Sequence, residues 1–415
     1  MNILFIIPYF PTPIRTRSYN IIKHLRLRCH SITVATLLED DEENLWVDEL
    51  QNYGINVNTF DLPKSRILIN TLSSLVTNKP IQSNYSWEPA LFNSIVKLIT
   101  DNPGYWDIIH VEHLRGAQYG IRLLNILKNN NIKIPLVWDS VDCISSLFKH
   151  ASKSSRSFFG RWITRFELSK TLDYESYALE CFDRVLVTSE NDRSHLLNLR
   201  KNYSFDDRRR SPEISVLANG VDLEYFSPCS LVVDSDIIIF TGKLSYHANF
   251  TAAMYLVEKI MPIIWDHNPR VVLNLVGKDP PKSLIRHSEK DKRIQVTGMV
   301  PDIRDFICRS SFAIAPLQYG AGIQNKVLEA MACSIPVIAS STAVSALSAA
   351  AGQDFIQANE PSDYADAAIH LMENPDLRAQ IGENGREYVK KNHDWNVVAE
   401  YLESIYMEIN EFNAA

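Results

Sequence analysis

The sequence has little cysteine, and none of it forms a pattern that carries chemistry. Six cysteines are scattered over 415 residues without a C-x-x-C pair. Metal-ligand spacing is therefore absent, and no disulfide framework is expected. Scattered cysteines of this kind are typical of proteins in a reducing cytosol, so we expect a cytoplasmic protein. The six are Cys29, Cys143, Cys181, Cys229, Cys308 and Cys333.

Long apolar runs and an excess of basic charge are lacking as well. No apolar stretch is long enough to span a bilayer. The start, MNILFIIPYF, has no basic segment and reaches Pro8 early, which predicts a buried strand rather than a signal peptide. The formal net charge is -7, which argues against bulk nucleic-acid binding. No G-x-G-x-x-G follows the first strand, which disfavours a dinucleotide oxidoreductase.

What the sequence does contain is two arrays of alternating strands and helices. The length favours more than one domain, and the alternation is typical of parallel sheets. We expect an α/β fold of two doubly wound, Rossmann-like domains facing across a cleft at the carboxyl ends of their strands. The domains are expected at 1–219 and 220–395, and the helix at 396–415 either caps the second domain or crosses back to the first. Strands are predicted at 2–7, 32–37, 55–60, 107–111, 135–138, 184–188, 214–218, 237–240, 271–276, 294–297, 312–315 and 335–339.

The stretch 311–340 has the pattern of a phosphate-binding unit. Its sequence is SFAIAPLQYGAGIQNKVLEAMACSIPVIAS, which predicts strand, glycine loop, helix and strand. Gly320 and Gly322 let the backbone approach a ligand, and a helix start at Asn325 offers unpaired N–H groups to phosphate. Lys326 adds a positive charge, and Glu329 lies one turn further on, where it can accept hydrogen bonds from sugar hydroxyls. This loop could hold both the diphosphate and the ribose of a nucleotide-sugar.

The same stretch resembles the nucleotide-binding signature of retaining glycosyltransferases of family 4, which have the GT-B fold. Three other stretches agree in order and spacing: ISVLANGVDLEYFSP, IIFTGKLSYHANFTAA and VTGMVPDIRDF. The phrases GIQNKVLEAMA, RSY and D-x-V-D are most similar to a bacterial branch of sugar transferases associated with exopolysaccharide gene clusters. The resemblance implies a hexosyltransferase-type enzyme of polysaccharide biosynthesis that retains anomeric configuration and needs no metal.

Two positions depart from the wider family. Its members carry two glutamates eight residues apart, and here Ala321 stands in the place of the first while Glu329 keeps the second. They also carry an arginine and a lysine five residues apart, and here Lys243 takes the first place and Ala248 the second. We interpret Lys326 as the cation that replaces the missing one. The resemblance then implies a donor-binding set of Gly242, Lys243, Gly298, Gly322, Ile323, Gln324, Asn325, Lys326 and Glu329.

The catalytic candidates lie in both arrays. Lys243 and Lys326 would stabilise the departing nucleoside diphosphate, because cations and backbone amides offset the charge that develops there. The strand DIIHVEH resembles the family strand that ends in H-x-H, so Glu112 or His113 is expected to contact the donor sugar or the acceptor hydroxyl. His110 is interpreted as a core histidine. Asp142, close to Asp139, either contacts a ligand or caps the next helix.

Of three basic stretches, two are open to two interpretations. Arg15 and Arg17 either contact phosphate or an anionic acceptor, or are solvated. The segment KSSRSFFGRWITRFELSK, 153–170, is either a basic amphipathic helix on a membrane surface, which suits a lipid-linked acceptor, or a helix whose aromatic face packs into its own domain. The arginines at 208–210 are interpreted as a solvated loop.

The expected function is the transfer of a sugar from a nucleotide diphosphate-sugar to a hydroxyl acceptor: a glycan, a lipid-linked glycan or a small molecule. A UDP-sugar is favoured as donor and a GDP-sugar stays open. No other cofactor, no metal and no nucleic acid are expected. The alternatives are a nucleotide-sugar epimerase of the same fold and a non-catalytic nucleotide-sugar-binding protein. The protein is expected in the cytoplasm, with peripheral contact to the inner face of the membrane left open.

Overall fold

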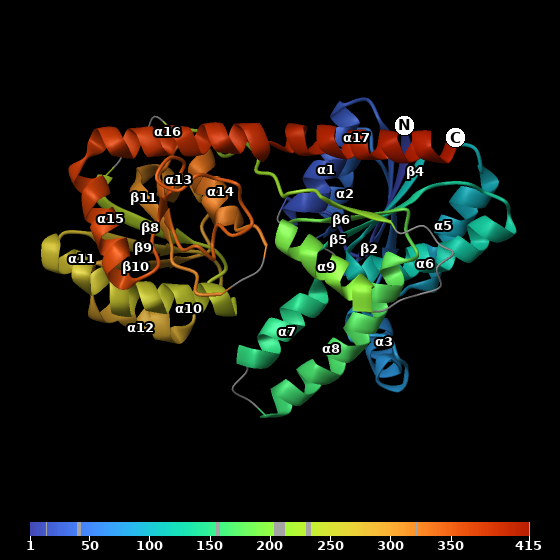
Figure 1. The fold of residues 1–415 in the computed structure, drawn as a ribbon, viewed down its shortest axis with the longest axis horizontal. Coiled ribbons are helices and arrows are strands. Elements are labelled where there is room, and N and C mark those ends of the chain that lie inside the picture. Colours follow the sequence, from blue (N-terminus) through green and yellow to red (C-terminus); the bar gives the residue numbers. More distant parts are fainter. Residues whose placement is uncertain are drawn as a thin grey trace. The chain divides into compact units, whose positions relative to one another are not determined.

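The chain folds into two compact units. The computed structural model describes residues 1–13, 15–39, 43–154, 158–202, 212–229, 234–319 and 322–414. The first unit comprises Met1–Ala218 together with Val398–Ala415, and the second comprises Asn219–Val397. Each unit is built on a parallel sheet with its own apolar core. Figure 1 shows the strands of each unit among the helices that cover them.

The first unit contains, in its described residues, a seven-stranded sheet of order β3-β2-β1-β4-β5-β6-β7. The inner strand β1 is apolar from Ile3 to Ile7 because both faces of the sheet are covered. Its neighbours pair in parallel, with Ile3 opposite Ile32 and Ile108. The strands are β1 (Asn2–Ile7), β2 (Ser31–Leu38), β3 (Asn56–Asp61), β4 (Ile108–Glu112), β5 (Leu136–Val141), β6 (Arg184–Val187) and β7 (Glu213–Val216). The helices are α1 (Thr16–Leu27), α2 (Asn44–Asn52), α3 (Lys64–Val76), α4 (Ile81–Tyr85), α5 (Pro89–Asp101), α6 (His113–Asn129), α7 (Ile144–Ser154), α8 (Phe158–Leu179) and α9 (Glu190–Asn202).

The second unit has, among the residues described, a six-stranded sheet of order β10-β9-β8-β11-β12-β13. Its strands are β8 (Asp234–Thr241), β9 (Val272–Val276), β10 (Ile294–Gly298), β11 (Ser310–Ala315), β12 (Val337–Ala339) and β13 (Ile356–Gln357). Its helices are α10 (His247–Tyr255), the π-helix η2 (Leu256–Ile260), α11 (Met261–His267), α12 (Lys282–Lys290), α13 (Arg304–Arg309), α14 (Asn325–Ala332), α15 (Pro361–Glu373) and α16 (Pro375–Asn392). The expected fold of two Rossmann-like parallel-sheet domains is confirmed, and the two-residue strand β13 was too short for its pattern to be recognised.

The last helix, α17 (Trp395–Ala414), returns to the first unit. The hydroxyl of Tyr406 lies 2.7 Å from Nδ1 of His110 in β4, and both side chains are buried. Glu403 pairs with Arg28 and His30. Of the two expectations for this helix, crossing back is the one observed. Glu403 is therefore an acidic residue of this helix that is paired rather than solvated.

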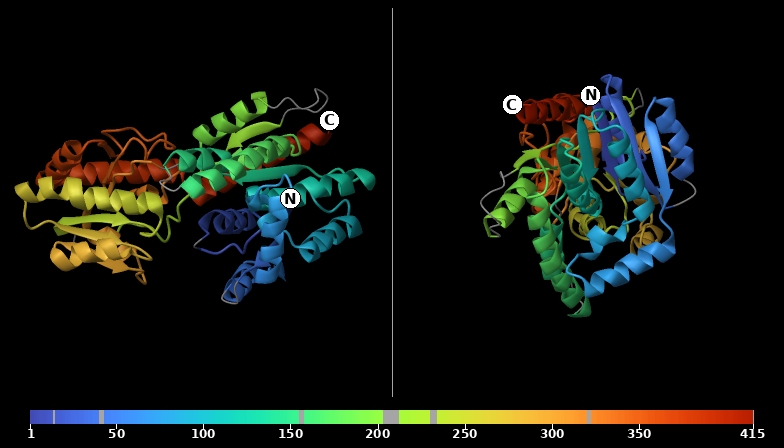
Figure 2. Two further views of the ribbon diagram at one scale, coloured as in Figure 1. Left: turned by 90° about the horizontal axis from the view of Figure 1, so that it is seen from below. Right: turned by 90° about the vertical axis from the view of Figure 1, so that its right-hand side faces the viewer.

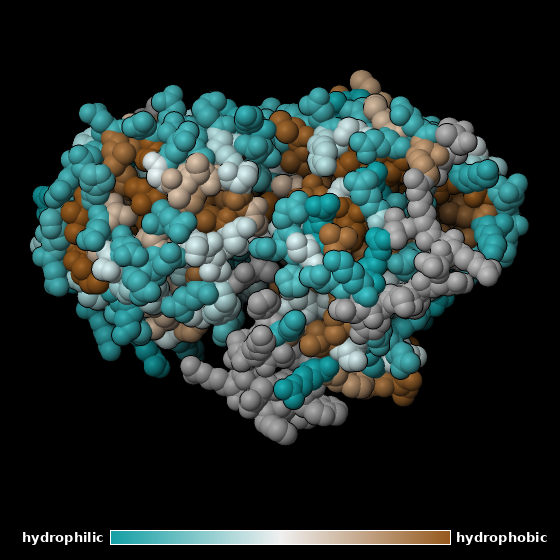
Figure 3. All heavy atoms as spheres, in the orientation of Figure 1, coloured by the Kyte–Doolittle hydropathy of each residue, from teal (hydrophilic) through white to brown (hydrophobic). Residues whose placement is uncertain are grey.

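The surface of the first unit carries one exposed apolar helix face. Leu68, Ile69, Leu72, Leu75 and Val76 of α3 are each more than half exposed. Figure 3 shows hydrophobic atoms at the lower right of the view, in the part where Figure 1 labels α3. Within the described residues, no helix is long and apolar enough to cross a membrane.

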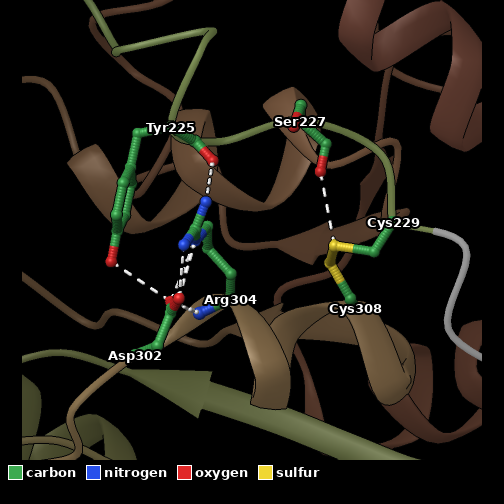
Figure 4. Close-up of polar contacts among 6 residues, drawn as sticks. All are labelled: Tyr225, Ser227, Cys229, Asp302, Arg304 and Cys308. Atoms are coloured by element: carbon green, nitrogen blue, oxygen red, sulfur yellow. Dashed lines mark hydrogen bonds and ion pairs between the residues drawn. A yellow bond between two sulfur atoms is a disulfide. The ribbon is translucent and has the colours of Figure 1, made fainter.

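One pair of cysteines is joined, although no disulfide framework is expected from the sequence. Cys229, in the segment that leads into the second unit, forms a disulfide with Cys308 of α13 across a sequence separation of 79. The same segment is held by Arg304, which donates a hydrogen bond to the carbonyl of Tyr225, while the Tyr225 hydroxyl donates to Asp302 (Figure 4). Sequence spacing could not show this pairing, because it depends on the segment folding back onto α13.

Candidate active site

The donor-binding candidates of the second unit gather at the carboxyl ends of β8 and β9. Gly242 and Gly277 follow these strands with φ of +135° and +153°, a region that favours glycine. A Cβ at Gly277 would lie 1.8 Å from the Gly242 carbonyl oxygen. The two strand ends therefore touch through backbone alone.

Lys326 reaches this place from the first turn of α14. Its Nζ donates a hydrogen bond to Oδ1 of Asn249 in α10 and lies 4.6 Å from the centre of the Phe240 ring. A Cβ on Gly242 would come within 3.3 Å of the same Nζ. Burial lowers the pKa of Lys326 to about 8, partly offset by the nearby Glu329. A lysine in the first turn of a helix opposes the helix dipole, so an anion beside it would be stabilising.

Glu329 follows one turn after Lys326 on the same helix. Burial raises the pKa of its carboxyl to about 7, against the opposing effect of Lys326. No residue in the described part of the chain donates a hydrogen bond to this carboxylate. A desolvated carboxylate without donors is costly unless a ligand supplies them. The geometry therefore fits a ligand that brings hydroxyl donors to Glu329 and negative charge to Lys326.

Lys326 and Lys243 differ in their surroundings, and Lys326 lies beside the position of Ala248. Ala248, where the family carries its lysine, is 5% exposed at the start of α10. The next residue, Asn249, accepts the hydrogen bond from Lys326. Lys243 differs from Lys326 in its surroundings. Its side chain is 62% exposed, and its Nζ lies 3.7 Å from Asp279. Lys243 is thus placed at the same strand end but on the solvent side.

The remaining donor-binding candidates are uncharged residues. Gly322 has φ +77° and Gly298 has φ +73°, and a Cβ at Gly298 would meet no atom within 4 Å. Ile323 packs against the core, and Gln324 is the N-cap of α14. Asn325 has a buried Oδ1 that lacks a hydrogen-bond partner among the residues described. Gly320, which is expected to let the backbone approach a ligand, lies outside the described residues. So does Ala321, which stands where the family carries a glutamate.

In the first unit, Glu112 ends β4 within a polar cluster. Its Oε1 accepts hydrogen bonds from the hydroxyls of Tyr9, at 2.5 Å, and Ser18, at 2.6 Å. Burial, with the negative charge of Asp139, raises the pKa of Glu112 to about 7. Among the described residues no donor meets Oε2. This carboxyl group can therefore take up a proton near neutral pH, as a general base does.

Asp139 of β5 neutralises Arg17. The Arg17 Nη2 and Nε atoms lie 2.8 and 2.9 Å from Oδ2 of Asp139, and both side chains are buried. Neither interpretation of Arg17 as solvated or as a phosphate ligand fits, because the guanidinium is buried against this carboxylate. Arg15 pairs instead with Glu43, at 2.9 Å. The interpretation of His110 as a core histidine is confirmed, since it is 1% exposed and bonded to Tyr406.

His113 and Asp142 lie just beyond the same strand ends. His113, directly after β4, has φ +62°, and Val141, the last residue of β5, has φ +65°. Strained backbone of this kind gathers at functional sites. Burial lowers the pKa of His113 to about 3, so its ring is neutral at physiological pH. Burial, with Asp192, raises the pKa of Asp142 to about 6.

The structure brings Glu112, His113 and Asp142 to one edge of the first sheet, and Lys243, Lys326 and Glu329 to one edge of the second. Sequence reasoning missed Tyr9, Ser18 and Asn249, which are ordinary polar residues without a motif of their own. In the described residues, no group of three or more His, Cys, Asp or Glu is placed to hold a metal ion.

Comparison with known proteins finds related sequences and folds. Residues 235–374, which contain Lys243, Lys326 and Glu329, match the sequence profile of the family described as Glycosyl transferases group 1. D-inositol 3-phosphate glycosyltransferase 2 of Catenulispora acidiphila is 22% identical over 326 residues, 73% of this chain and 71% of that protein. The corresponding enzyme of Corynebacterium glutamicum is 22% identical over 245 residues, 54% of this chain and 57% of that protein.

Solved structures show the same fold. Anabaena HepE in complex with UDP superposes with a TM-score of 0.67 at 16% identity, covering 98% of this chain and 100% of that one. HepE has also been solved with UDP-glucose. Sucrose-phosphate synthase from Thermosynechococcus elongatus gives a TM-score of 0.66 at 15% identity, with 100% of both chains covered. The fold is GT-B, and with the group 1 glycosyl transferase segment the chain is a glycosyltransferase.

Proposed function

We propose that the protein transfers a sugar from a UDP-sugar to a hydroxyl acceptor with retention of anomeric configuration, as a family 4 enzyme of the exopolysaccharide-associated branch. In the reaction, the bond from the anomeric carbon to the diphosphate oxygen breaks. A bond from that carbon to the acceptor oxygen forms, and the acceptor proton is taken up by a carboxylate.

The pair Lys326 and Glu329 carries this proposal. One is a desolvated ammonium group at a helix start, and the other is a desolvated carboxyl group one turn further on. Lys326 would hold the diphosphate and stabilise the charge that develops as it departs. Glu329 would accept hydrogen bonds from the ribose hydroxyls. The choice of uracil as the base is supported by HepE, which has been solved with UDP and with UDP-glucose.

The other candidate residues would support nucleotide binding and catalysis. The amides of Gly322 to Gln324 and the open backbone at Gly298 would approach the nucleotide closely. Lys243, on the solvent side, would add charge to the diphosphate. In the first unit, Glu112 is the proposed acceptor of the proton, with His113 and Asp142 positioning the acceptor hydroxyl.

The test compares nucleotide binding and turnover in four proteins. Glu329→Gln keeps the shape of the side chain but removes the charge, and Lys326→Met keeps its length. Each is expected to weaken UDP binding by about 10-fold or more, since each removes charge-assisted hydrogen bonds. Glu373→Gln, on the exposed surface of α15, is the matched control.

Isothermal titration with UDP, GDP and ADP measures the affinities, and release of UDP from UDP-sugars with and without a hydroxyl acceptor measures turnover. Tighter binding of GDP than of UDP would contradict the choice of donor. Interconversion of UDP-sugars without any acceptor would replace the transferase by an epimerase. Unchanged UDP affinity in Glu329→Gln would refute the ribose assignment.

A further inference from the structure

Helix α3 of the first unit turns an apolar face to solvent. The exposed fractions are 60% for Leu68, 57% for Ile69, 54% for Leu72, 55% for Leu75 and 87% for Val76. At 100° per residue these five side chains fall within an arc of about 120°. They form a continuous stripe along the helix, which we call the α3 stripe.

The inward face of α3 is polar. Asn70 is 5% exposed and donates from Nδ2 to the carbonyls of Tyr85, at 3.1 Å, and Trp87, at 2.9 Å. Ser74 is fully buried and donates to the carbonyl of Asn70 at 3.0 Å. This is the reverse of an ordinary surface helix, which buries its apolar side. Rotating the helix to hide the stripe would break these buried hydrogen bonds.

A second contact fixes the end of the helix. Lys170 of α8, itself 9% exposed, donates from Nζ to the carbonyls of Ser74, at 2.5 Å, and Thr77, at 2.7 Å. The right-hand view of Figure 2 shows α3, in blue, at the lower edge of the first unit and α8, in green, beside it. The α3 stripe is thus held outward from both sides, by the loop before α5 and by α8.

Basic residues accompany the stripe. Lys64, at the start of α3, is exposed, as is Asp61 three residues before it. Arg66 pairs with Glu88 at 3.1 Å and Lys79 donates a hydrogen bond to Gln118, so these two charges are engaged within the unit. Apart from the buried Lys170, the sequence 149–170, which leads into the part of α8 beside α3, has five Lys or Arg and one Glu.

We propose that the α3 stripe docks this protein on the surface of an anionic lipid membrane, with the stripe inserted among the acyl chains and the neighbouring basic residues facing the headgroups. An apolar helix face next to clustered Lys and Arg is the arrangement that binds such surfaces. This proposal does not rest on the sugar chemistry, because vesicle binding needs neither donor nor acceptor.

The composition of the stripe favours lipid over a protein partner. Its five residues are all aliphatic, and no Trp, Tyr or Arg interrupts them. Protein interfaces concentrate their binding energy in Trp, Tyr and Arg, and leucine is under-represented at those positions. An aliphatic stripe gains free energy from acyl chains without a shaped partner.

From the sequence, 153–170 is either a basic helix on a membrane surface or a helix whose aromatic face packs into its own domain. Much of that segment lies outside the residues whose side chains are described. In its described part, Lys170 is turned into the protein, where it anchors α3. We therefore assign the apolar contact to α3 and only the charge to its neighbour.

The test is co-sedimentation of the full chain with vesicles of phosphatidylcholine alone and of phosphatidylcholine with phosphatidylglycerol. The wild type is expected to bind the anionic vesicles and to be released by added salt. Leu68→Gln/Leu72→Gln should lower the partition coefficient by about 10-fold or more, because two inserted side chains become polar. Both positions are exposed, so the melting temperature should not change.

The matched control is Leu27→Gln/Leu45→Gln, which replaces two exposed leucines of the same unit on α1 and α2. It should bind as the wild type does. A second variant, Lys64→Glu, should weaken binding to anionic vesicles only. Failure of the wild type to bind anionic vesicles would overturn the proposal, as would equal losses in the stripe and control variants. A wild type that dimerises in solution through the stripe, and does not bind vesicles, would instead indicate a second copy as the partner.

Discussion

Lys326 of α14 and Asn249 of α10 are joined by a hydrogen bond, although 77 residues separate them in the chain. This bond aims the ammonium group at the carboxyl end of β8, beside Gly242. It also makes Lys326 the neighbour of the position where the family carries its second cation. We propose that the ammonium group of Lys326 serves in place of that cation.

The affinity for UDP should depend on pH in a bell shape. Glu329 must be ionised to accept hydrogen bonds, and burial raises its pKa to about 7, so affinity should fall as the pH drops below that value. Lys326 must be charged, and burial lowers its pKa to about 8, so affinity should fall by about 10-fold at one pH unit above that value. Titration calorimetry over a pH range that extends below the Glu329 pKa and above the Lys326 pKa measures both sides.

The variants separate the two sides of this profile. Glu329→Gln should remove the dependence at low pH, and Lys326→Met the dependence at high pH. An affinity that stays constant across the whole range in the wild type would show that neither group contacts the nucleotide.

Glu112→Gln should lower kcat by about 100-fold or more while leaving UDP affinity unchanged, because the residue lies in the first unit. The wild-type kcat should rise with pH through about 7, as burial and Asp139 raise the Glu112 pKa to that value and the base must be ionised to act. In Glu112→Gln this rise should be absent. Steady-state kinetics over pH tests both points, and a full kcat in Glu112→Gln would exclude it as the base.

Tyr406→Phe should lower the free energy of unfolding of the first unit by about 1–3 kcal/mol. The change leaves Nδ1 of His110 without its 2.7 Å partner in a buried site. Tyr401→Phe on the same helix is the control, since Tyr401 is 48% exposed. Urea unfolding measures the difference; equal stability of the two variants would mean that the Tyr406–His110 hydrogen bond adds nothing to stability.

Loss of the disulfide should lower the stability of the second unit by about 2–4 kcal/mol, because the bond closes a long loop. Cys229→Ser is expected to unfold at lower denaturant concentration than the wild type, and a reducing agent should have no further effect on it. Cys29→Ser, which removes an exposed free cysteine, serves as control. If a reducing agent leaves the wild-type midpoint unmoved, the bond adds nothing to stability.

Much of the architecture could be predicted because it is written in local patterns. The continuous apolar runs at β1 and β11 identified buried parallel strands, and the helix expected after the glycine loop is α14, Asn325–Ala332. Neighbouring residues determine such features, because burial on both faces of a sheet demands apolar side chains at successive positions. The candidate nucleotide loop was found for the same reason.

The partners of charged residues could not be predicted in this way. Arg17 and Asp139 lie 122 residues apart, so nothing in the letters around Arg17 showed that a carboxylate would bury it. The disulfide between Cys229 and Cys308 is a similar case.

The sequence by itself determined the strands, the glycine loop and the presence of Lys326 and Glu329 on one helix. Only the tertiary structure decided that Lys326 donates a hydrogen bond to Asn249 and that Arg17 forms an ion pair with Asp139. It also decided that α3 buries its polar side. The physical reason is that hydrophobic periodicity is a local property of the chain, whereas hydrogen bonds and ion pairs depend on which distant groups the packed sheets bring within reach.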